Sequence, residues 1–207
     1  MSQNIDLKAL EKKAWRSVFQ DGLWDIYLGI ILISFAVSAG LDKLSIDDDL
    51  RMGSYISVMV FGMIVLYVGK RFITIPRMGT VKFGAERQKR RNIVRLVLFV
   101  SVLLGLLMWW LSSSLLVDGK WVMPLVWMLN MFLVFGLGAY FLEYERLYLI
   151  GLLYALVLPV DMIVKAITKM DMDVYIFSTA GLIILVMGIA YLVRFMSDYK
   201  PLDLNQG

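Results

Sequence analysis

Six long apolar stretches, separated by short charged segments, constrain the fold of this chain more than any other feature. A helix that crosses about 30 Å of hydrocarbon needs about 20 mostly apolar residues, at a rise of about 1.5 Å per residue. The stretches that satisfy this length span residues 22–41, 54–74, 92–116, 121–141, 147–167 and 174–195. Helices satisfy their backbone polar groups internally, as the bilayer requires. We therefore expect an all-α membrane protein with six transmembrane helices in three hairpins.

The segments outside these stretches extend a single integral membrane domain over residues 1–207. Residues 1–21 carry charges before the first apolar run and lack a small-residue cleavage pattern, so we expect no cleaved signal peptide. Apolar and basic residues recur there at helical spacing, which predicts an amphipathic interfacial helix; the alternative is a solvated extension of the first span. The hairpin regions are residues 22–74, 92–141 and 147–195, with a loop at 75–91 and a tail at 196–207.

Basic residues are distributed unevenly between the two sides that six crossings would create. Sixteen of the 21 lysines and arginines fall on the side that holds both termini, and five fall on the other side. Lysine and arginine are enriched in cytoplasmic segments of membrane proteins. We therefore expect a multi-pass protein of the cell membrane with its N-terminus and C-terminus in the cytoplasm. An odd number of spans would break this regular alternation.

The basic loop between the second and third spans is the most distinctive segment. Proline and glycines interrupt its helical periodicity, and alternating apolar positions predict a short extended, β-like element under the membrane. Basic side chains there could bind anionic lipid or a protein partner, or could only hold the neighbouring helices in their orientation. We expect no nucleic-acid binding, because no recognition module accompanies the charge. The candidate binding residues are Arg71, Arg77, Lys82, Arg87, Lys89, Arg90 and Arg91.

Pairs of glycines recur at seven-residue spacing in three of the predicted spans. Residues seven apart lie nearly on one face of a helix, and glycine lets a neighbouring backbone approach closely. These faces therefore predict helix contacts, either within the chain or with a second copy in a homo-oligomer. The glycines concerned are Gly22, Gly29, Gly62, Gly69, Gly181 and Gly188.

Few polar or ionisable residues lie within the predicted spans, so each is a functional candidate. Asp25 follows the inner end of the first span and could form an ion pair or bind a cation. Asp161 and Lys165 are four residues apart near the outer end of the fifth span, a spacing that permits a helical ion pair. Asn130 lies near the middle of the fourth span. Together these four residues could line a solute path, or each could pair with a neighbouring helix.

The absence of histidine and cysteine excludes several kinds of chemistry. Disulfides, thiol nucleophiles, imidazole catalysis and the usual zinc ligand sets all need one of these residues. The only dense acidic run, at residues 47–49, lacks a second acidic cluster with which to bind metal, and no phosphate-binding glycine-rich loop is present. We therefore expect no enzyme activity, no metal and no cofactor.

Two functions remain open from the sequence. The first is a non-catalytic membrane protein that acts by self-association, or by binding a partner membrane protein or anionic lipid. The second is a small passive or ion-coupled channel or carrier for a small solute. They differ in where the polar residues within the spans point: into a hydrated path for the carrier, or between packed helices for the associating protein.

Overall fold

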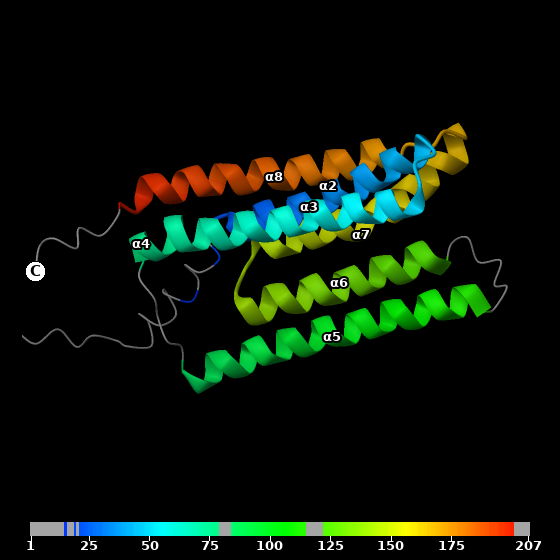
Figure 1. The fold of residues 1–207 in the computed structure, drawn as a ribbon. Helices are drawn as coiled ribbons and strands as arrows, with labels where there is room; N and C mark the ends of the chain where they lie inside the picture. Colours follow the sequence, from blue (N-terminus) through cyan, green and yellow to red (C-terminus); the bar gives the residue numbers. More distant parts are fainter. Residues whose placement is uncertain (1–14, 16–18, 20, 79–83, 115–121, 201–207) are drawn as a thin grey trace, which may run out of the picture. The chain divides into compact units, whose positions relative to one another are not determined.

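The computed structural model describes residues 15, 19, 21–78, 84–114 and 122–200, and the described residues form helices joined by short connections, without a strand. Figure 1 shows the helices coloured from blue to red along the sequence. They are α2 (Leu23–Lys43), α3 (Asp48–Gly69), the π-helical turn η1 (Lys70–Thr74), α4 (Ile75–Met78), α5 (Ala85–Ser114), α6 (Val122–Leu142), α7 (Arg146–Thr168) and α8 (Asp173–Asp198). The predicted all-α class is confirmed.

Five of the described helical segments are long and apolar enough to cross a membrane. These segments are α2, the continuous helix from Asp48 to Met78, α6, α7 and α8. Residues 92–114 of the third predicted span belong to α5, which is 30 residues long and begins with a charged segment. Large apolar side chains such as Phe61, Leu129 and Val186 are about half exposed or more, which fits helices surrounded by lipid.

The helices fall into two compact units. The first contains α2, α3, η1, α4 and α8 from Phe177 onwards, and the second contains residues 84–176 with α5, α6 and α7. The sequence predicted three hairpins, but the third hairpin is divided, because α7 belongs to the second unit and most of α8 to the first. The hairpin prediction pairs helices that are neighbours in the sequence, whereas α8 packs against α2.

In the first unit, α2 and α8 pack backbone to backbone through the predicted glycines. A Cβ atom added at Gly29 would lie 2.9 Å from the nitrogen of Leu185 and 3.0 Å from the oxygen of Gly181. A Cβ at Gly188 would lie 2.7 Å from the nitrogen of Ile26, and one at Gly22 would clash with the oxygen of Gly188. The contacts pair rising with falling residue numbers, so the two helices are antiparallel. Only glycine permits so close an approach.

Helix α3 packs on another side of α2, again at glycines. A Cβ at Gly62 would lie 2.9 Å from Ile30, and one at Gly69 would lie 2.6 Å from Leu23. These two α2 side chains therefore fill the space above the α3 glycines. Leu23 and Ile30 also form the core of the unit with Ile26, and side chains from α3 and α8 pack around them: Val58, Val65, Leu66, Leu185 and Leu192. All six predicted packing glycines thus contact helices of the same chain.

The second unit uses aromatic residues where the first uses glycine pairs. Phe135 of α6 packs against Gly151 of α7 and stacks on Tyr154, with 4.8 Å between ring centroids. Trp127 donates a hydrogen bond from Nε1 to the backbone oxygen of Tyr154, at 2.8 Å. Gly151 thus leaves space for the ring of Phe135, and the carbonyl of Tyr154 accepts the hydrogen bond of the Trp127 indole. These contacts fix the register between α6 and α7.

The prediction of an extended loop over residues 75–91 is wrong where the structure describes it. Helix α3 continues through η1 and α4 to Met78, and α5 begins at Ala85. Pro76 was expected to break the helix because it lacks an N–H and its ring crowds the preceding turn. The π turn before it widens the backbone, and Ile75 donates its N–H to the carbonyl of Lys70 five residues earlier. Residues 79–83 lie outside the described part.

The start of α3 also differs from the predicted span, which began at residue 54. Helix α3 starts at Asp48, because Asp48 and Asp49 occupy its first turn and complement the positive end of the helix dipole. Arg51 links this end to the last turn of α2 through an ion pair with Asp42, and it also pairs with Asp48 in the first turn of α3, at 2.8 Å. The predicted amphipathic helix falls mainly outside the described residues, as does the end of the tail from residue 201.

Candidate functional site

The basic residues at the start of α5 divide into a paired set and an exposed set. Arg87 Nη1 lies 2.5 Å from Glu143 Oε1, and Arg90 Nη1 lies 3.0 Å from the same oxygen. Arg87 and Glu143 are only 12% and 16% exposed. Arg90 also reaches Glu86, at 3.3 Å. One carboxylate therefore receives charge-assisted hydrogen bonds from two guanidinium groups.

A tight helix end places Glu143 for this contact. Helix α6 ends at Leu142, and Glu143 follows with a left-handed φ of 54°. The N–H of Tyr144 donates to the carbonyl of Ala139 at 3.0 Å, and the N–H of Glu143 donates to that of Tyr140 at 3.4 Å. This pattern is the Schellman motif, which usually has glycine at the left-handed position. Glutamate is strained in this left-handed conformation because it carries a Cβ atom. Its carboxylate links the end of α6 to the start of α5.

The exposed set lies on the other faces of α5. Lys89, Arg91 and Arg95 are exposed, and no ion pair links Lys89 or Arg91 to a carboxylate among the described residues. Arg95 is within 3.4 Å of the oxygen of Asn92. Directly after these charges the helix surface becomes apolar, and Phe99 is 61% exposed. Charge followed by exposed apolar surface is the arrangement expected of a helix that enters a membrane from its interface.

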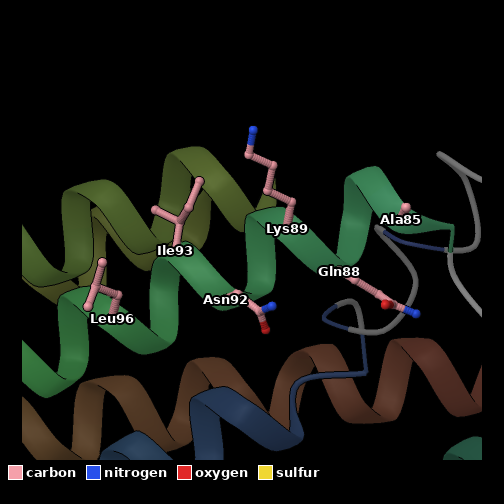
Figure 2. Close-up of a pocket in the computed structure, with 6 residues that line it drawn as sticks. All are labelled: Ala85, Gln88, Lys89, Asn92, Ile93 and Leu96. Atoms are coloured by element: carbon pink, nitrogen blue, oxygen red, sulfur yellow. The ribbon is translucent and has the colours of Figure 1, made fainter.

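A shallow hollow of about 370 Å³ runs along this exposed surface. The described residues that line it all belong to α5: Ala85, Gln88, Lys89, Asn92, Ile93 and Leu96. Figure 2 shows Lys89 and Ile93 extending to one side of the helix and Gln88 and Asn92 to the other. Residues four apart form ridges on a helix, so the hollow lies along the groove between these two ridges. Its first part is polar and its last part is apolar.

The other described basic residues that the sequence predicted, Arg71 and Arg77, belong to the first unit. Arg71 is exposed on the π turn, and Arg77 donates a hydrogen bond from Nη1 to the carbonyl of Ile73, at 3.1 Å. Both belong to the first unit, whereas Lys89 belongs to the second. Lys82 lies outside the described residues.

A second polar cluster lies in the first unit, where Asp21 is completely buried. Lys70 Nζ contacts Asp21 Oδ2 at 2.5 Å, and the hydroxyl of Thr74 donates to the same oxygen at 2.6 Å. The other carboxylate oxygen accepts the N–H of Leu23 at 3.2 Å. Lys70 and Thr74 begin and end the π turn, so the widened turn directs both side chains at one carboxylate. The carboxylate is thereby compensated for its loss of water.

Asp25 lies one turn further along α2 and is also completely buried. A Cβ atom added at Gly188 would lie 2.9 Å from the Cβ of Asp25, so the glycine of α8 leaves space for this side chain. The sequence predicted that Asp25 could form an ion pair or bind a cation. The carboxylate that contacts the Lys70 ammonium is Asp21, one turn earlier.

The other predicted path residues lie in the second unit. Asn130 donates a hydrogen bond from Nδ2 to Ser101 Oγ at 2.9 Å, which links α6 to α5. Lys165 forms an ion pair with Asp171 at 2.5 Å, just beyond the end of α7. Asp161 lies one turn before Lys165 on the same helix. Asp25 belongs to the first unit, so the four residues do not form one cluster within either unit.

Sequence reasoning missed the partners that complete these contacts: Asp21, Thr74, Ser101, Glu143 and Asp171. It also missed Gln88 and Asn92, which line the hollow. A signal for Glu143 was present, because it ends the fourth span on the side where Arg87 and Arg90 begin the third. Opposite charges at one predicted interface can meet when antiparallel helices pair. The missing information was which helix pairs with which.

Neither unit shows a metal centre within its described residues, where no group of three or more candidate ligand side chains is arranged around one point. Comparisons of the chain with known protein families, with curated proteins and with solved structures found no match in any of the three.

Proposed function

We propose that this chain is a non-catalytic, multi-pass membrane protein that acts by association, and that the start of α5 binds anionic lipid. One observation carries the proposal. Glu143 and Glu86 together match the charges of Arg87 and Arg90, while Lys89, Arg91 and Arg95 stay exposed directly before the apolar part of the helix. The ion pairs of Arg87 and Arg90 with Glu143 hold α5 against α6. The exposed cations are therefore available to bind lipid headgroups. On this proposal the start of α5 faces the cytoplasm, in agreement with the excess of basic residues on that side.

Lipid is a better supported partner than a second copy of the chain. The glycine faces that could have mediated self-association are occupied by α2, α3 and α8 of the same chain. The exposed cations, in contrast, have no carboxylate that offsets them among the described residues of α5. Each cation held near an anionic membrane surface contributes about 1 kcal/mol to binding.

The test is lipid selectivity of the purified protein in mixed micelles. Native mass spectrometry would measure how strongly phosphatidylglycerol is retained relative to phosphatidylcholine. The variant Lys89→Gln, Arg91→Gln, Arg95→Gln should lose about 3 kcal/mol of this preference, on the order of 100-fold. The matched control is Lys43→Gln, Lys165→Gln, Lys169→Gln, which removes the same charge from the opposite helix ends and should keep the preference. Equal loss in both variants would contradict the proposal.

A second candidate function is an ion-coupled carrier, and the buried Asp21–Lys70 pair supports it. A buried carboxylate and amine at a π turn could exchange a proton as the turn changes shape. Reconstituted liposomes containing a pH-sensitive dye would test this candidate. The wild-type protein should then carry a proton flux that Asp21→Asn abolishes. Equal proton leak in protein-free and protein-containing liposomes would eliminate it.

A further inference from the structure

We infer that the hollow on α5 holds the phosphate group and the first part of one acyl chain of a single anionic phospholipid. This inference rests on the proposed function and deepens it, because it replaces general attraction to an anionic surface with one defined site. The hollow has the chemistry of a phospholipid in the same order along its length. Donors come first, at Gln88, Lys89 and Asn92, and apolar side chains follow, at Ile93 and Leu96.

The polar part of the hollow can satisfy a phosphodiester. The Lys89 ammonium supplies positive charge and up to three N–H donors, and the carboxamides of Gln88 and Asn92 also carry N–H groups. Figure 2 shows the lysine and the two carboxamides on opposite sides of the groove. A phosphate in the groove would therefore meet donors from both ridges. No acidic residue lines the hollow among the described residues, so nothing there repels an anion.

The apolar part of the hollow distinguishes a lipid from a free phosphate. Ile93 and Leu96 lie one to two turns beyond Lys89, so about 6–10 Å along the helix axis. Leu96 is 61% exposed, and the helix surface beyond it remains apolar. An acyl chain that runs along α5 from the glycerol beside the phosphate would cover this surface. Inorganic phosphate or glycerol phosphate would gain nothing from it.

The neighbouring ion pairs keep the site in place without occupying it. Arg87 and Arg90 point to Glu143 and hold this part of α5 against α6. Because Glu143 and Glu86 together match these two charges, the net positive charge at this end of α5 comes from the exposed cations. Of these cations, Lys89 lines the hollow, and Arg95 lies beside it through its contact with Asn92.

The experiment is a titration of the full-length protein with short-chain phosphatidylglycerol in a neutral detergent, with bound lipid counted by native mass spectrometry. The wild-type protein should show one saturable site. The variant Gln88→Leu, Asn92→Leu keeps every charge and should weaken that site at least tenfold, because it removes hydrogen bonds to a charged group. Lys89→Gln should weaken it about fivefold, the effect of one well-placed headgroup charge. Glycerol phosphate at equal concentration should not compete.

The outcomes separate this inference from the proposed function. Arg91→Gln should lower the overall preference for anionic lipid and leave the single site intact, since Arg91 does not line the hollow. If Gln88→Leu, Asn92→Leu retains full affinity while the charge variants lose lipid preference, the single site is overturned and the proposed function stands. If no variant changes lipid binding, both fall. Competition by glycerol phosphate equal to that of the lipid would overturn the acyl-chain part. Unchanged thermal stability of each variant shows that the fold is retained.

Discussion

At the residue scale, Asp21 shows how a carboxylate is accommodated without contact with water. Its two oxygens receive an ammonium group, a hydroxyl and a backbone N–H. Burial of a charge is costly, and the geometry of these donors decides whether the cost is offset. Glu143 is handled in the same way in the other unit, with two guanidinium groups as donors. Both carboxylates pair with cations from a different helical segment, so each one fastens two segments together.

Asp21→Asn should destabilise the protein by about 2–3 kcal/mol. Removal of one partner from a buried pair costs about 3–5 kcal/mol, and the effect is smaller here because Lys70 keeps partial access to water. Thermal unfolding in detergent would measure the change, with the exposed Asp49→Asn as control. The double variant Asp21→Asn, Lys70→Met should recover part of the loss. A double variant no more stable than the single variant would show that the pairing is not the cause.

Glu143→Gln should destabilise the second unit by about 1–3 kcal/mol, because two partly buried arginines lose their shared carboxylate. The neighbouring Glu145→Gln is the matched control, since Glu145 is exposed and its change in charge is the same. Hydrogen exchange at the first turns of α5 would report the loss locally. Equal effects of the two variants would argue that net charge matters and the ion pairs do not.

At the element scale, two devices determine how these helices associate. The α2–α8 contact relies on glycine, so the separation between the two backbones sets which side chains the interface tolerates. The helix from Asp48 to Met78 relies on a π turn, which lets an apparently broken sequence continue as one helical segment. The π turn also brings Lys70 and Thr74 to the same carboxylate, so an irregular backbone and a buried charge occur together.

Gly29→Leu and Gly181→Leu should each destabilise the first unit by about 2–3 kcal/mol, because backbone atoms within about 3 Å cannot move aside as a flexible side chain would. Gly53→Leu and Gly105→Leu are matched controls, since nothing lies within 4 Å of a Cβ at either position. Thermal unfolding of the four variants would measure the difference. Equal stability of all four would contradict the close α2–α8 contact.

At the scale of the whole molecule, two units of helices and an uneven distribution of basic residues describe the protein. The basic residues near the helix ends predict the orientation of the protein, and the apolar middle parts of the helices predict where it contacts lipid. Because the natural chain has no cysteine, a single introduced cysteine reports on the side of the membrane it occupies without background.

Gln88→Cys and Asp198→Cys should react with a membrane-impermeant maleimide only from the cytoplasmic side, and Asp47→Cys only from the opposite side. The physical reason is the excess of basic residues on the side that holds residues 88 and 198. Labelling of intact cells and of inverted vesicles would measure this. An odd number of spans between residues 88 and 198 would place these two cysteines on opposite sides.

The sequence by itself determined the helical class, the long apolar segments and the glycine faces, because hydropathy and helical periodicity are local properties of a chain. It did not reveal the π turn, since Pro76 and its flanking glycines read locally as a break. It also did not reveal that Glu143 holds Arg87 and Arg90, or that Asp21 holds Lys70. Only the tertiary structure decided these pairs, because which charges meet depends on which helices pack together and in which register.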